Sequence, residues 1–125
     1  MKNELIAIGW VAAFGAVGSV LRYLVGVAFK SAGYTFPAWT LVVNVVGCFL
    51  LGLLAGAAVQ RGPFSAVVHP GVTAGFLGGL TTFSALSVES IQLIQLRGLS
   101  WGLANLAVNL ALGLLAAWLG FQLQR

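Results

Sequence analysis

The chain has 125 residues, of which 60% are hydrophobic and only 6% are charged, and its formal net charge is +4. A soluble domain is nearer a quarter charged, so this composition indicates an integral membrane protein with no room for a separate soluble domain. The six basic residues are scattered and form no patch, which argues against a nucleic-acid partner. Residues 1–125 are therefore expected to form one transmembrane domain.

Four apolar segments are each long enough to cross a bilayer, which takes about 20 residues in a helix. They cover residues 5–29, 38–59, 70–96 and 101–123, with connections at 30–37, 60–65 and 97–100. Trp39 and Trp101 stand where the second and fourth segments begin, and indole rings favour the membrane interface. We expect an all-α membrane protein with four transmembrane helices and both termini on one side.

The basic residues divide almost evenly between the two sides of such a protein. The side of the termini has Lys2, Arg61 and Arg125, and the opposite side has Lys30 and Arg97, with Arg22 nearby inside the first segment. An imbalance of basic residues normally orients membrane helices. Two interpretations remain open: another signal sets one orientation, or the protein inserts both ways and pairs antiparallel.

Small residues recur at helical spacing in the first three segments. The positions are Gly15, Gly18 and Gly26 with Arg22, then Gly52 and Gly56, then Gly71, Gly75 and Gly79. Such faces let helices approach closely in lipid, and close packing is the better interpretation for most of these glycines. Four helices can hardly enclose a pathway alone, so we expect an oligomer.

The third segment contains a pattern that a continuous helix would not favour. Gly78 and Gly79 are adjacent, and Thr81 and Thr82 follow after one residue. Glycine is poor in a helix interior, and threonine is stiff and competes for backbone hydrogen bonds. We predict a helix break over residues 78–81 at membrane depth, with a half-helix on either side. Free backbone groups at such breaks often bind transported ions.

Polar groups in membrane segments are expensive and are functional candidates by default. The candidates are Arg22, Asn44, Thr81, Thr82, Ser84, Ser87, Glu89, Gln92, Asn105 and Asn109. Glu89 is the only acid beyond the N-terminal tail, and a cation pathway would need more acids. A pathway lined by amides and hydroxyls suits a small anion or a polar neutral solute. Structural roles stay open. Arg22 could snorkel, or pair with Glu89 or with a helix C-terminus, and Asn44 could join helices. Hydroxyl groups often bond the carbonyl four residues earlier.

Enzyme chemistry is not expected from the residue types present. His69 is the only histidine and Cys48 the only cysteine, so the chain has neither a metal-ligand cluster nor a CxxC motif. It also lacks a Ser/His/Asp set and a phosphate-binding loop.

The stretch GFLGGLTTFS, residues 75–84, resembles the signature of the Fluc/CrcB family of fluoride channels. The pattern from Gly15 through Gly18 to Arg22-Tyr23 and the stretch TLVVNVVG, residues 40–47, resemble the family's first- and second-helix motifs. The resemblance covers all four segments in register. It implies an antiparallel, dual-topology homodimer in the inner (plasma) membrane, with two pores that passively export fluoride and so relieve its toxicity.

The resemblance also implies roles for individual residues. Backbone carbonyls of Gly78 and Thr81 would bind a central structural Na⁺ on the two-fold axis, and Arg22 would be a structural polar residue. The pore and fluoride-binding residues would be Asn44, Phe83, Ser84, Ser87, Glu89 and Asn109. Fluoride is strongly hydrated, so its pore must supply hydrogen-bond donors, which amides, hydroxyls and the edges of aromatic rings can provide.

Three positions depart from the family pattern. Ala85 lacks a hydroxyl, Leu86 lacks the second ring of the aromatic box, and Gly113 stands where a serine is common. A heterodimer of paired subunits, or a non-conducting assembly subunit, is therefore an alternative. A small dual-topology multidrug exporter is a further rival, but its membrane carboxylate would have to be Glu89, which lies after the break and not in the first helix.

Overall fold

The structure is a computed structural model that describes residues 1–34, 37–62 and 69–124. Residues 35–36 and 63–65 of the expected connections, and Arg125 of the charge count, lie outside the described residues. Within the described ranges, four helices are long and apolar enough to cross a membrane, as expected from the sequence: Lys2–Ser31, Ala38–Arg61, Gly71–Arg97 and Leu99–Gln122. The protein is thus an all-helical, multi-pass membrane protein.

Three of the spans are single helices and the third is composite. The single helices are α1 (Lys2–Ser31), α2 (Ala38–Arg61) and α5 (Leu99–Gln122). The third span begins as a π-helix, η1 (Gly71–Leu77), continues as the short α3 (Gly78–Leu80) and ends as α4 (Phe83–Arg97). The sequence did not indicate the π-helix. This form is rare, and where it occurs it often lies at a functional site.

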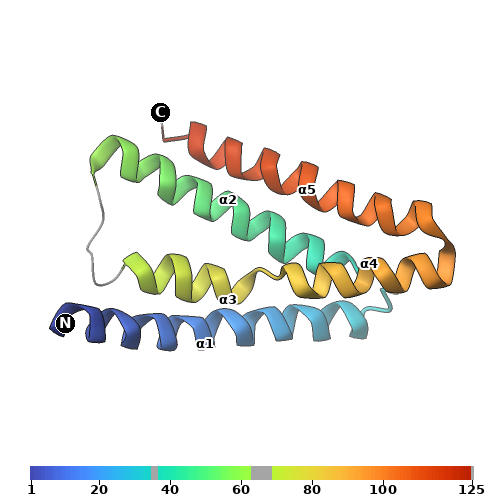
Figure 1. The fold of residues 1–125 in the computed structure, drawn as a ribbon, viewed down its shortest axis with the longest axis horizontal. Helices are drawn as coiled ribbons and strands as arrows, with labels where there is room; N and C mark the ends of the chain where they lie inside the picture. The colour runs from blue at the N-terminus through green and yellow to red at the C-terminus, as the bar shows by residue number, and fades with distance from the viewer. Residues whose placement is uncertain (35–36, 63–68, 125) are drawn as a thin grey trace.

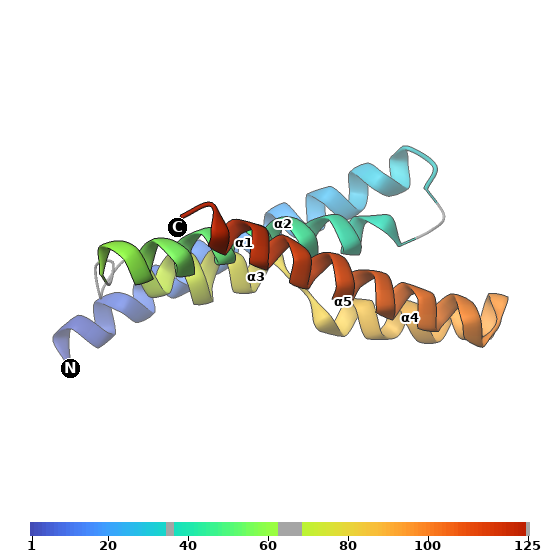
Figure 2. The ribbon, with the colours of Figure 1, turned by 90° about the horizontal axis from the view of Figure 1, so that it is seen from above.

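The spans pack as two pairs that meet at the break in the third span. In Figure 1, α1 lies along η1 and α3, α2 lies along α5, and α4 packs on α5. Both termini lie at the same end, as four spans require. Figure 2 shows that, at the end opposite the termini, the last turns of α1 and the first turns of α2 lie apart from the last turns of α4 and the first turns of α5.

Glycines bring both helix pairs into backbone contact. A Cβ atom at Gly18 of α1 would overlap the carbonyl oxygen of Phe76, and one at Gly75 would come within 2.8 Å of the carbonyl of Val11. On the other pair, a Cβ atom at Gly52 would overlap the Ala117 carbonyl. The expected packing role of these glycine faces is confirmed.

The break lies slightly later than predicted. Gly78 and Gly79 are helical, whereas Thr81 (φ −80°, ψ 156°) and Thr82 (φ −153°, ψ 114°) are extended. The glycines serve packing instead, since a Cβ atom at Gly79 would come 2.7 Å from the carbonyl of Gly15 on α1. The threonines end one helix and start the next, because the Thr82 hydroxyl caps α4 by accepting from the Ala85 N–H at 3.2 Å.

Candidate functional site

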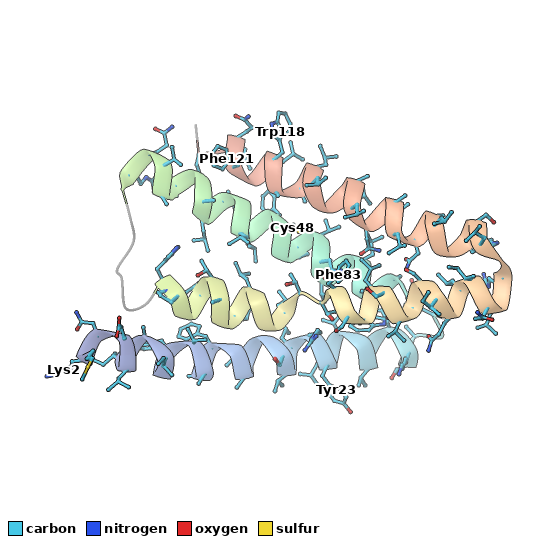
Figure 3. All side chains as sticks on the ribbon, viewed as in Figure 1. Lys2, Tyr23, Cys48, Phe83, Trp118 and Phe121 are labelled. Carbon is cyan, nitrogen blue, oxygen red and sulfur yellow. The ribbon has the colours of Figure 1, made fainter. Side chains whose placement is uncertain are left out.

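A groove of about 380 Å³ lies beside the break, between η1, α2, the start of α4 and α5. Six of the candidate residues named from the sequence line it together: Asn44, Gly78, Thr81, Thr82, Phe83 and Asn109. Cys48 of α2 lines the same groove as Phe83 at the start of α4, and Figure 3 labels both side chains on their helices. The helix break, the amides of Asn44 and Asn109 and the ring of Phe83 thus belong to one site.

Asn44 takes the place of a helical partner for Thr82. The Thr82 N–H donates to Asn44 Oδ1 at 2.8 Å, and Asn44 Nδ2 donates back to the Thr82 carbonyl at 3.3 Å. In a continuous helix that N–H would bond the carbonyl four residues earlier, on Gly78. The amide of α2 therefore satisfies the backbone of the break, which lipid could not do.

The polar contacts continue from Asn44 into α5 and α4. Asn44 Nδ2 donates to Asn109 Oδ1 at 3.3 Å, and Asn109 Nδ2 donates to the Asn105 carbonyl at 3.0 Å and to Asn105 Oδ1 at 3.4 Å. Asn105 Nδ2 then donates to Ser90 Oγ at 3.0 Å, and Ser90 donates to the Leu86 carbonyl at 2.7 Å. Within the described part of the chain, every buried side-chain nitrogen and oxygen has a partner.

Phe83 is the first residue of α4 and its side chain is 74% exposed, although it borders the groove. Leu86, one turn later, also lines the groove but is only 4% exposed. A large, exposed ring beside a helix break is available to a ligand or to a second protein copy. Leu86 instead belongs to the packed interior of the single chain.

Ser84 and Ser87 of α4 lie near the break but not among the groove-lining residues. The Ser84 hydroxyl is 3.3 Å from the Thr82 hydroxyl, and Ser87 donates to the Phe83 carbonyl at 2.9 Å. The bond of Ser87 to its own helix is the structural role that the sequence had left open. Ser84 remains exposed.

Glu89 has a hydroxyl partner and not a cationic one. The buried Thr40 hydroxyl lies 2.6 and 2.5 Å from the two carboxylate oxygens of Glu89, which share its single donor proton. Among residues 1–34, 37–62 and 69–124, the one ion pair joins the Met1 amino group to Glu4, so the pairing of Arg22 with Glu89 that we had considered does not form. Arg22 lines a separate groove of about 280 Å³ with Lys30 and Trp39.

The carbonyls expected to bind a cation belong to Gly78, the first residue of α3, and to Thr81, which follows its last residue. Because Thr82 turns its N–H to Asn44, the carbonyl of Gly78 loses its usual helical donor. The N–H and hydroxyl of Thr81 both bond to the Leu77 carbonyl at 3.0 Å, which anchors the residue while its backbone is extended. Unwound backbone carbonyls are suitable ligands for Na⁺, but two from one chain make at most part of a coordination shell.

Two residues of this polar network were not among the candidates drawn from the sequence. Thr40 precedes Asn44 by four residues and so shares its face of α2, a signal that could have found it. Ser90 lies one residue after Glu89, but nothing in the sequence indicates that Asn105 packs against it. The contact between Asn105 and Ser90 depends on the packing of α4 against α5.

Comparisons with known proteins agree on one family. Residues 9–121 match the family model described as CrcB-like protein, Camphor Resistance (CrcB). The chain is 42% identical over 116 residues to the Fluoride-specific ion channel FluC of Geobacter sulfurreducens, covering 92% of this chain and 94% of the relative. It is also 42% identical over 123 residues to FluC 2 of Rhodococcus jostii, covering 98% of each chain, and 41% identical over 124 residues to FluC of Rhizobium meliloti, covering 98% and 97%.

Proposed function

Since the chain belongs to the CrcB-like family of fluoride-specific ion channels, which are not enzymes, we propose that it conducts fluoride passively and selectively out of the cell and so relieves fluoride toxicity. The observation that carries the proposal is the groove at the break of the third span. There a side-chain amide clamps the backbone and an exposed ring stands at a helix start. Such a break provides polar groups at membrane depth without exposing them to lipid.

The groove suits an anion better than a cation. Helix α4 begins at Phe83, so the positive end of its dipole and its first N–H groups lie at the groove. The edge of the Phe83 ring carries the positive part of its quadrupole and can face the same ion. Asn44, Phe83 and Asn109 would form the site at the break, and Ser84, Ser87 and Glu89 would continue the pathway along α4.

We assign the protein as an antiparallel homodimer in the inner (plasma) membrane. The almost even division of basic residues supports dual topology. Of the 30 residues of α1 only Gly18 is buried in a single chain, which leaves an extensive face for a partner or for lipid. A second, antiparallel copy would close the open side of each groove and give two pores. Arg22 of α1 would have a structural role, because it lines a separate groove and not the groove at the break.

The same dimer would complete a Na⁺ site on its two-fold axis. The Gly78 and Thr81 carbonyls of two copies would supply four oxygen ligands, where one chain supplies two. Prolonged replacement of Na⁺ by N-methylglucamine should then reduce fluoride flux and weaken the dimer. Unchanged flux and unchanged dimer mass after Na⁺ removal would contradict the assignment.

Fluoride efflux from proteoliposomes tests the proposed function directly. The purified chain alone is reconstituted with internal fluoride, and an electrode follows release after a K⁺ ionophore is added. Fluoride release above that of protein-free liposomes is expected. If the chain alone releases none, but a mixture with a second family member does, it is one subunit of a heterodimer. Drug-driven proton exchange without fluoride release would favour the exporter.

A further inference from the structure

The amide of Asn44 has no donor left for an ion in the observed arrangement. A carboxamide has two N–H donors. In Asn44 one donor goes to the Thr82 carbonyl and the other to Asn109 Oδ1, each at 3.3 Å, while Oδ1 accepts from the Thr82 N–H. For Asn44 to bind an anion, one of these two contacts has to be exchanged for the ion.

Asn109 presents only an acceptor to Asn44. Its own amino group is engaged by Asn105, through the carbonyl at 3.0 Å and Oδ1 at 3.4 Å. Its side chain is 5% exposed, so water cannot readily replace these partners. The orientation of the Asn109 amide is thereby fixed, with its oxygen facing the Asn44 donor. An oxygen in this orientation attracts N–H groups and repels an anion.

The contact with Asn109 is the one that an anion can displace at least cost. Both donor contacts of Asn44 are longer than the usual 2.7–3.2 Å of an N–H···O bond, so both are weak. Releasing the Thr82 carbonyl would disturb the backbone of the break. Releasing Asn109 only frees a side-chain oxygen, and a hydrogen bond to a charged acceptor is roughly twice as strong as a neutral one.

We propose that Asn109 Oδ1 holds the Asn44 donor when no ion is present and yields it to fluoride, so that Asn109 sets the affinity of the groove for the ion. The role rests on the proposed function, because it requires fluoride to reach Asn44. In this role Asn109 lowers the affinity of the groove for fluoride. Such competition favours conduction, since an ion that is bound too tightly leaves slowly.

The test observes the Asn44 amide itself. The full chain, labelled with ¹⁵N-asparagine in micelles, has four asparagines, Asn3, Asn44, Asn105 and Asn109, and loss of one signal in Asn44→Asp assigns the Asn44 amide. Fluoride should shift that signal in the parent. In Asn109→Ala the signal should be displaced before fluoride is added, and the titration midpoint should fall about threefold to tenfold, as expected for one lost hydrogen bond.

Asn105→Ala is the matched control. It also removes a buried amide, but its backbone carbonyl still engages Asn109 Nδ2, so the midpoint should equal that of the parent. If Asn109→Ala does not fold, Asn109→Leu removes the acceptor with nearly the same side-chain shape.

An Asn44 signal that responds to fluoride with the same midpoint in parent and Asn109→Ala would overturn the proposal and leave the channel function intact. A parent that conducts fluoride without any response of Asn44 would also overturn it. A parent that neither conducts nor responds would remove the proposed function and this role together.

Discussion

Asn44 on α2 bonds both backbone groups of Thr82 on the third span, with its Oδ1 2.8 Å from the Thr82 nitrogen and its Nδ2 3.3 Å from the Thr82 oxygen. One side chain thus pairs with the peptide groups that a helix break would leave open in lipid. Because Asn44 also contacts Asn109, the break in the third span is coupled to α2 and α5. Asn44, Thr82 and Asn109 all line the groove.

Asn44→Ala should therefore impair both structure and conduction. It leaves the Thr82 N–H and carbonyl without their partner, at about 1–3 kcal/mol for each unsatisfied group. We expect a lower unfolding temperature, faster hydrogen exchange in the peptide around Thr82 and loss of most fluoride flux. Gln95→Ala removes an exposed amide of α4 and should leave all three unchanged. Parent-like exchange at Thr82 in Asn44→Ala would show that the clamp is dispensable.

Phe83→Ile should reduce fluoride flux sharply without destabilising the single chain. The ring is 74% exposed, so its removal creates no cavity, but the variant loses the only aromatic edge among the described groove-lining residues. The measurement is proteoliposome efflux beside the thermal unfolding temperature. Leu96→Ile, at an 82% exposed position of the same helix, is the control. Equal flux in Phe83→Ile and the parent would exclude an aromatic role.

Leu86→Phe, which introduces the second ring of the family pattern, should lower stability. Because Leu86 is only 4% exposed, the larger ring should overpack the interior by about 1–3 kcal/mol. A lower unfolding temperature is expected, whereas an unchanged temperature together with higher flux would show that the ring enters the groove.

Dual topology predicts that one loop site is accessible from both sides of the membrane. Ser31→Cys in a Cys48→Ser background places a single thiol at the exposed end of α1. An impermeant maleimide should label about half of the protein from outside and the rest only after permeabilisation, as two equally populated orientations require. Complete labelling from one side would contradict dual topology. Two lysines added near Ser31 should bias the distribution.

Gly78→Val separates contacts within one chain from contacts between copies. The nearest atom to a Cβ at Gly78 is the Thr73 carbonyl oxygen, 3.8 Å away, so a single chain has room for it. If Gly78 faces a second copy near a shared Na⁺, the variant should fold but lose dimer mass and flux. Gly79→Ala is the contrasting variant, since its Cβ would come 2.7 Å from the Gly15 carbonyl within one chain. A dimeric, conducting Gly78→Val would place the interface elsewhere.

Much of the architecture could be predicted because membrane spans follow from length and hydropathy. The four spans and the packing role of Gly18, Gly52 and Gly75 agree with the structure. The break was predicted over residues 78–81 and lies at Thr81 and Thr82, because Gly78 and Gly79 are helical despite their low helix propensity, and Gly79 packs closely on α1. Tertiary packing overrode propensity there, and the threonines made the break.

The candidate site could be predicted only where one residue carried the signal. Asn44 was identifiable because an amide in a membrane segment needs a partner. The bonds of Thr40 to Glu89 and of Ser90 to Asn105 depend on which helices are neighbours, and a single sequence does not reveal that pairing. For the same reason, only the structure shows that Glu89 bonds to Thr40 and not to Arg22 within one chain.

The most direct test of the central claim is the reversal potential of the purified chain in a planar bilayer with opposing gradients of fluoride and chloride, each anion being present on both sides. Passive, selective conduction predicts a current that reverses close to the fluoride equilibrium potential and persists without any proton gradient. A reversal potential near that of chloride, or a current that requires a proton gradient, would contradict the account.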